Sequence, residues 1–84
     1  MLENKEIGKR IRETREKKGL TIIYVVDKLK EKDIEISTDK YLEYENGDVD
    51  DMPIDTIGVL GKVFGVSPPY LLGWLDENGE EIKD

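Results

Sequence analysis

Few side chains in this sequence could carry out chemistry, and the usual catalytic types are absent. The 84 residues contain no Cys and no His. Thiol nucleophiles, imidazole bases, disulfide bonds and tetrahedral zinc sites of the finger or ribbon type are therefore excluded. Because no nucleophile and base can be paired from the remaining side chains, we expect neither enzyme activity nor a cofactor.

Three carboxylates, at Asp48, Asp50 and Asp51, could instead suggest a calcium-binding loop. The spacing does not fit such a loop. Its sixth position would be Pro53 rather than Gly, and its twelfth would be Val59 rather than Glu. We therefore expect no metal site.

The charges are distributed unevenly along a chain whose net charge is −7. Residues 1–19 carry seven Lys or Arg and four acidic residues, whereas residues 20–56 carry four Lys and eleven acidic residues. Proteins that bind nucleic acids usually have a basic face, and here only the first helix could supply one. Its cations could form such a patch or a solvated helix face: Lys9, Arg10, Arg12, Lys17 and Lys18.

Length and patterning indicate one small all-α domain over residues 1–75, followed by a polar tail, residues 76–84, that we expect to fray. No stretch approaches the ~20 apolar residues of a membrane span, and the start of the chain lacks the apolar core of a signal peptide. We therefore expect a cytoplasmic protein with no membrane segment.

Apolar periodicity and capping residues predict five helices, over about residues 5–18, 21–32, 37–46, 53–64 and 67–75. Thr21, Ser37 and Ser67 are suitable N-caps, and Pro53 suits the first position of the fourth helix. The second segment is rich in Val, Ile and Tyr, so a strand is the competing prediction; the Thr21 cap and the charged residues that follow favour a helix. The residues expected to face the core are Ile7, Ile11, Val25, Val26, Leu29, Tyr41, Tyr44, Ile57, Leu60 and Phe64.

Several short segments occur in an order and spacing typical of one protein family. They are residues 7–12 (IGKRIR), Arg15, residues 19–21 (GLT), residues 44–47 (YENG), residues 63–68 (VFGVSP) and residues 70–73 (YLLG). Together they resemble the phage-repressor (Cro/C1, Xre-like) helix-turn-helix family over about residues 6–74. The resemblance implies a five-helix lambda-repressor-like DNA-binding domain in which the second and third helices form the helix-turn-helix.

In that family the second helix crosses the phosphate backbone and the third lies in the major groove. The resemblance therefore implies DNA contacts from one set of residues: Thr21, Ile22, Ser37, Thr38, Asp39, Lys40, Leu42 and Glu43. Arg15 and Glu45 match positions that form a salt bridge between the first and third helices. Homodimerisation is implied for the last helix, through Tyr70, Trp74 and Leu75, although Trp74 could equally pack on the domain's own first helix.

The sequence departs from the family pattern in charge and in one turn. Asp39 and Glu43 could accept from cytosine N4 but cannot pair with guanine, and the loop of residues 48–51, often basic in this family, is acidic here. Ile22 stands where a phosphate-contacting Gln is usual. The turn between the second and third helices is also longer than the family's tight form.

Three apolar residues open the second helix, and two explanations of them remain. Ile22, Ile23 and Tyr24 could form a surface for a protein partner, or the longer turn could fold back and cover them. We expect a DNA-binding transcriptional regulator, a repressor-like homodimer that reads duplex DNA through the third helix. The alternative is a protein-interaction module of the same fold that has lost DNA affinity because its DNA face is acidic.

Overall fold

The computed structural model describes residues 3–76 and 78–81 of the chain. Within those ranges it contains five α-helices and no β-strand, with one isolated bridge between Leu75 and Glu81. The helices are α1 (Asn4–Lys17), α2 (Ile22–Glu31), α3 (Thr38–Asn46), α4 (Ile54–Phe64) and α5 (Pro68–Leu71). The predicted all-α class is confirmed, and the second segment is a helix rather than the competing strand.

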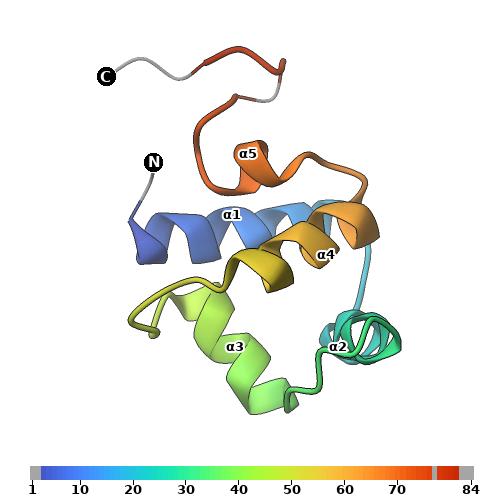
Figure 1. Ribbon diagram of the computed structural model, residues 1–84. Helices are drawn as coiled ribbons and strands as arrows, with labels where there is room; N and C mark the ends of the chain where they lie inside the picture. The colour runs from blue at the N-terminus through green and yellow to red at the C-terminus, as the bar shows by residue number, and fades with distance from the viewer. Residues whose placement is uncertain (1–2, 77, 82–84) are drawn as a thin grey trace.

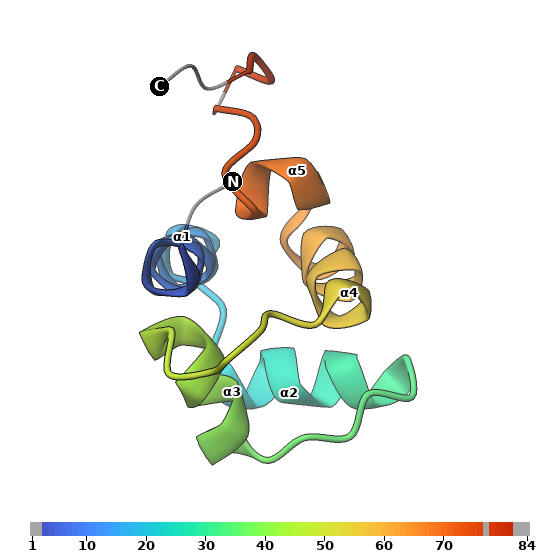
Figure 2. The same ribbon diagram turned by 60° about the vertical axis from the view of Figure 1, so that its left-hand side comes forward.

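α1 and α4 occupy the middle of the molecule, α5 lies above them, and α2 and α3 lie below (Figures 1 and 2). α1 packs against α3 and α5, α4 packs against α2 and α5, and α2 packs against α3. The first turn of α3 lies at the lower edge of the molecule in both views, at the end opposite α5. The fold therefore presents α3 at one end and the chain around α5 at the other.

Apolar side chains from all five helices meet in a single core. Its buried members are Ile7, Ile11, Val25, Leu29, Tyr41, Tyr44, Met52, Ile57, Leu60, Phe64, Leu71 and Leu72. Burial of each large aliphatic or aromatic side chain contributes roughly 1.5–3 kcal/mol relative to exposure. Val26, expected inside, is only partly buried, whereas Met52 and Leu72 join the core from outside the helices.

Hydroxyl side chains begin three of the helices, as predicted. Thr21 Oγ1 accepts from the Tyr24 amide at 3.1 Å, Ser37 Oγ from the Lys40 amide at 3.0 Å, and Ser67 Oγ from the Tyr70 amide at 3.3 Å. Each bond satisfies an amide that has no partner within its own helix. Pro53 is the residue before α4 rather than its first residue.

α1 and α3 approach each other so closely that glycine is required at the contact. A Cβ on Gly8 would overlap the backbone carbonyls of Tyr44 and Glu45, and a Cβ on Gly47 would overlap the backbone of Lys5. Gly47 also has a φ of 72°, which ends α3 in the left-handed conformation. By contrast, a Cβ on Gly58 would meet no atom within 4 Å.

The connector between α2 and α3 begins with an unusual backbone conformation. Asp33 has a φ of 65°, which L-residues other than Asn and Asp rarely adopt. The Asp33 and Ile34 amides donate to the carbonyls of Lys30 and Leu29, each at 3.0 Å, so the end of α2 keeps its hydrogen bonds. Ile34 and Ile36 then pack against the core.

The fifth helix is shorter than predicted. α5 ends at Leu71, and Trp74 and Leu75 follow it instead of belonging to it. Gly73 has a φ of 81°, and the amides of Gly73 and Trp74 donate back to the carbonyls of Tyr70 and Pro69. These two bonds form the glycine-dependent helix end of the Schellman type, which the prediction placed too late.

The described residues of the polar tail, which we expected to fray, form a hydrogen-bonded turn. Asp76 Oδ1 accepts from the amides of Asn78 at 2.8 Å and Glu80 at 3.0 Å, and the Asp76 amide donates to the Glu80 carbonyl at 2.8 Å. One aspartate thus closes a turn that the bridge between Leu75 and Glu81 continues. Among the described residues, no helix is long and apolar enough to span a membrane.

Candidate nucleic-acid interface

An ion pair fixes α3 on α1. Arg15 Nε lies 2.6 Å from Glu45 Oε2, and Arg15 Nη2 lies 3.1 Å from Glu45 Oε1. Arg12 Nε donates to the same Oε1 at 3.3 Å, and Arg12 also bonds the side chain of Asn46. Arg15 Nη1 further donates to the Leu20 carbonyl at 3.0 Å. The resulting network joins α1, α3 and the turn before α2.

Burial and pairing act against each other at this carboxylate. The Glu45 side chain is fully buried and that of Arg15 is 13% exposed. Burial alone would raise the pKa of Glu45, but hydrogen bonds led by that of Arg15 outweigh it, so the pKa of Glu45 lies below its usual value. The hydrogen bond to Glu45 in turn raises the pKa of Arg15. Glu45 is therefore an ionised, tightly held group whose carboxylate is not accessible to a ligand.

Tyr41 is the buried neighbour of this pair. Its hydroxyl makes no hydrogen bond of good geometry within the described residues. Burial, together with the nearby Glu45 carboxylate, raises the pKa of Tyr41 above its ordinary value. The phenol therefore remains neutral, and with Tyr44 it forms the inward side of α3.

The outward side of α3 is polar and uncovered. Thr38, Asp39, Lys40 and Glu43 are exposed, and Leu42 is partly buried. Residues four apart share one side of a helix, so Asp39 and Glu43 lie on the same stripe. These residues are among those the sequence assigned to DNA contact, and the structure brings them together on a single exposed face. Ser37 is also exposed, but its hydroxyl accepts from the Lys40 amide.

Lys40 lies across this face rather than projecting freely from it. Its Nζ is 3.5 Å from Glu43 Oε2 and 5.7 Å from the centre of the Tyr44 ring. Such an exposed ion pair contributes little to stability, but it partly neutralises Glu43. Within the part of the chain that the structure describes, Asp39 has no ion-pair partner within 4.0 Å.

The start of α2 presents apolar side chains to solvent. Thr21 is exposed and Ile22 is partly buried against the core, but Ile23 is 67% and Tyr24 is 44% exposed. The Lys28 ammonium lies 5.4 Å from the centre of the Tyr24 ring. The connector does not fold back over Ile23 and Tyr24, so the explanation that it covers all three residues is wrong.

The loop after α3 is held by the Asn4 side chain, which bonds the backbone of the loop and leaves its acidic side chains in solvent. Asn4 Nδ2 donates to the carbonyls of Val49 at 2.8 Å and Asp50 at 2.9 Å. The side chains of Asp48, Asp50 and Asp51 are exposed. In residues 3–76 and 78–81, no group of three or more potential ligands is placed to hold a metal ion.

The basic residues of α1 do not form one free patch. Arg10 Nη1 donates to the carbonyls of Tyr70 at 2.8 Å and Leu75 at 3.1 Å, and its guanidinium lies 4.7 Å from the centre of the Tyr70 ring. Arg12 is engaged by Glu45 on the other side of the helix. Sequence reasoning missed the role of Arg10, since two of its partners are backbone carbonyls and no residue type identifies them.

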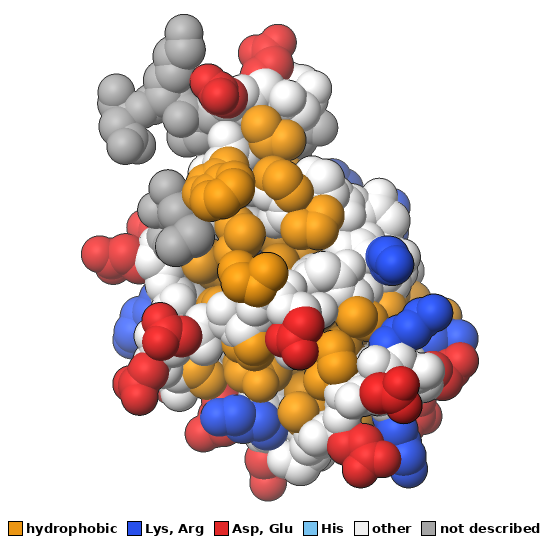
Figure 3. Space-filling model, in the orientation of Figure 1, with side chains coloured by type: hydrophobic (Ala, Val, Ile, Leu, Met, Phe, Trp, Pro, Cys, Tyr) orange, Lys and Arg blue, Asp and Glu red, His pale blue; other side chains and the backbone are white. Residues whose placement is uncertain are grey.

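An apolar surface lies at the end of the molecule away from the first turn of α3. Trp74 is 52% exposed, and Tyr70 and Leu75 are partly buried beside the Arg10 contacts. Figure 3 shows hydrophobic side chains gathered over α5 and the chain around it, whereas acidic, basic and hydrophobic side chains are mixed over the lower half. Of the three expected dimer residues, Trp74 is the one that projects furthest into solvent.

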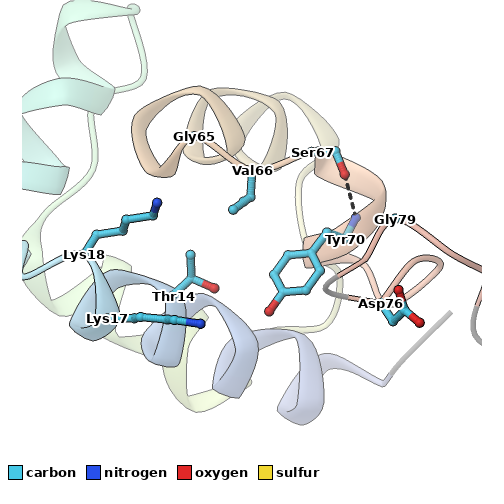
Figure 4. Close-up of a pocket in the computed structure, with 9 residues that line it drawn as sticks. All are labelled: Thr14, Lys17, Lys18, Gly65, Val66, Ser67, Tyr70, Asp76 and Gly79. Carbon is cyan, nitrogen blue, oxygen red and sulfur yellow. Dashed lines mark hydrogen bonds between the residues drawn. The ribbon is translucent and has the colours of Figure 1, made fainter.

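A cavity of about 310 Å³ lies between the end of α1, the turn before α5 and the turn of the tail (Figure 4). Lys17 at the end of α1 and Lys18 directly after it line the cavity on one side, Val66 lies above it, and Tyr70 lines it on the α5 side. None of its described lining residues belongs to α2 or α3. The cavity is therefore separate from the exposed face of α3.

Comparisons with known proteins add no relative to this description. No protein-family model, no curated protein and no solved structure matches the chain.

Proposed function

We propose that the protein is a DNA-binding transcriptional regulator in which α2 and α3 act as a helix-turn-helix and α3 enters the major groove. The observation that supports this most directly is the two-sided character of α3. One side is fixed by Tyr41, Tyr44 and the buried Glu45 pair, and the other is polar, exposed and at the edge of the molecule. A rigidly held helix with an unobstructed polar side is what direct reading of base edges requires.

Two features of α2 support a role for its first turn beside α3 in DNA binding. α2 packs against α3, and its capping residue Thr21 is exposed. In this mode the exposed start of α2 faces phosphates, for which a helix N-terminus provides free amides and a favourable dipole. The exposed Ile23 and Tyr24 would contact sugar rather than phosphate. This arrangement positions the protein, while α3 reads sequence.

The proposed assembly is a homodimer that binds two half-sites. Trp74 is large, half exposed and held on a fixed turn, so it provides an aromatic residue suited to the centre of an interface. Sedimentation of the wild type and Trp74→Ala at matched concentrations tests this. We expect a concentration-dependent dimer that Trp74→Ala weakens. Ile23→Ala, which removes an exposed apolar side chain from α2, is the control and leaves the dimer intact.

The charge of the DNA face limits non-specific affinity. Asp48, Asp50 and Asp51 would approach phosphates, and each such approach costs on the order of 1 kcal/mol at ~4 Å in water. Lys40 is partly occupied by Glu43. We therefore expect non-specific binding weaker than the ~10⁻⁴–10⁻⁶ M common among DNA-binding proteins at physiological salt.

The deciding experiment is selection from a random duplex library at low salt, followed by a salt titration of the selected duplexes. We expect specific binding that the triple variant Asp48→Asn/Asp50→Asn/Asp51→Asn strengthens on every duplex. Glu80→Gln/Glu81→Gln, which removes acids from the tail, is the control and leaves affinity nearly unchanged. Failure of both the wild type and the triple variant to bind any duplex contradicts the proposal.

One observation favours a second candidate function, a protein-interaction module of the same fold. Ile23 and Tyr24 are exposed on α2, which packs against α3, and the exposed side of α3 contains Asp39 and Glu43. A partner with an apolar centre and a basic rim would complement it. Absence of DNA binding, together with capture of such a basic partner that Tyr24→Ala abolishes, would favour this module over the regulator.

A further inference from the structure

The acidic side chains on the exposed side of α3 differ in whether they form an ion pair. Asp39 and Glu43 lie on the stripe opposite the buried Tyr41 and Tyr44, so both point away from the core. Glu43 is held by Lys40 at 3.5 Å. Asp39 has no ion-pair partner within 4.0 Å in the described part of the chain. It is also in the first turn of α3, the part that lies at the lower edge of the molecule (Figures 1 and 2).

Its neighbours in that first turn cannot discriminate between bases as sharply. The Ser37 hydroxyl already accepts from the Lys40 amide, and Lys40 itself lies toward Glu43 and the Tyr44 ring. The Thr38 hydroxyl both donates and accepts, so it tolerates either kind of base edge. An ionised Asp39 only accepts.

An acceptor-only group distinguishes the four bases in the major groove. Guanine presents two acceptors there, and thymine presents an acceptor and a methyl group, so neither offers Asp39 a donor. Adenine offers one donor beside an acceptor. Cytosine offers its N4 amino group as a donor without an adjacent acceptor on the same base. Cytosine is therefore the base that a carboxylate on this helix suits best.

We infer that Asp39 is a specificity-determining residue that reads a cytosine N4 amino group in each half-site; this rests on the proposed DNA-binding function. The surrounding acids sharpen the effect. Because they repel phosphates at every sequence, a duplex without the cytosine leaves Asp39 desolvated and unpaired with little electrostatic attraction to offset it. Binding of a duplex then depends on whether it has cytosine at this position.

The test compares wild type with Asp39→Asn on the duplex selected by the wild type and on its three base substitutions at the cytosine. We expect wild type to lose roughly 5- to 150-fold in affinity when the cytosine is replaced, the usual cost of one mismatched base pair. Asn pairs with adenine N6 and N7, so Asp39→Asn shifts the preference from cytosine to adenine. The side chain is exposed, and an unchanged helical circular dichroism spectrum verifies folding of the variant.

Two controls separate this inference from the proposed function. Asp48→Asn removes an acid of the loop and is expected to raise affinity on all four duplexes without changing their order. Glu43→Gln alters the acid that Lys40 partly neutralises and is expected to change the order less than Asp39→Asn does. If wild type binds a selected duplex and Asp39→Asn keeps the same base preference, the cytosine inference is overturned while DNA binding stands. If no duplex is bound by wild type or variant, both are overturned.

Discussion

Glu45 and Asp39 are carboxylates of the same short helix in opposite surroundings. Glu45 is fully buried and bonded by two arginines. Asp39 is exposed, and it forms no ion pair with any residue that the structure describes. A buried charge tolerates only one arrangement, because leaving it unpaired costs several kcal/mol. The inward side of α3 thus determines where the helix lies, while the outward side is free to vary its chemistry with little effect on folding.

The largest expected effect comes from the contact that brings the inward side against α1. Gly8→Ala would place a Cβ onto the carbonyls of Tyr44 and Glu45, neither of which can move without displacing α3. We expect a loss of about 3 kcal/mol or more, at the upper end of overpacking effects. Chemical denaturation measures it. Gly58→Ala is the matched control and gains up to about 1 kcal/mol, because its Cβ meets open space and helix propensity rises.

The ion pair itself is expected to have the next largest effect. Arg15→Ala leaves Glu45 buried with only the longer bond from Arg12, and we expect a loss of about 1–3 kcal/mol. A double-mutant cycle with Glu45→Ala checks the coupling, since removing both partners costs less than the sum of the single changes. Additive losses would contradict a direct interaction.

The lowered pKa of Glu45 predicts how this contribution depends on pH. Because the folded-state pKa lies below the unfolded value of about 4.3, the stabilisation is complete above that value and disappears as pH falls through the folded-state pKa. The stability gap between wild type and Glu45→Gln should therefore be widest near neutral pH and shrink below about pH 4.3. A gap that stays constant down to strongly acidic pH would show that ionised Glu45 is not the source.

The smallest expected change is on the outward side. Asp39→Ala removes an exposed group without an ion pair, so its effect on stability should stay within about 0.5 kcal/mol. The same thermal and denaturant measurements apply, with Thr38→Ala as a neighbouring exposed control. A loss comparable to that of Arg15→Ala would mean that the two sides of α3 are not energetically distinct.

The parts of this fold that depend on local patterns were predictable from the sequence. The apolar spacing of α1 and α4 and the capping hydroxyls of Thr21, Ser37 and Ser67 identify the helices because they act within a few residues along the chain. Ile22 to Leu29 remained ambiguous, since β-branched residues suit strands as well as buried helix sides.

Features that depend on one residue's backbone conformation, or on which of several neighbouring partners a side chain contacts, were not predictable. The early end of α5 follows from Gly73, whose left-handed conformation no periodicity reveals. Asp76 closes the tail turn through backbone amides, so its composition alone indicated fraying. In the candidate site, helical spacing predicted that residues 38–43 lie together. It did not predict that Lys40 lies toward Glu43 and Tyr44, because Lys40 has several possible partners within one turn of the helix.

The hydrogen bonds of Arg10 fix the chain around Trp74 relative to α3, and this matters for a dimer formed through Trp74. The same helix that holds α3 through Arg15 holds the chain after α5 through Arg10, little more than one turn of helix away. α1 therefore acts as a rigid spacer between the proposed dimer surface and the proposed reading helix. In such a homodimer the fold sets the separation of the two α3 helices. Inserting a few base pairs between the half-sites would shift one half-site along the duplex and rotate it about the duplex axis, so that its α3 could no longer reach it. An operator for this protein would tolerate changes in the sequence of its spacer far better than changes in its length.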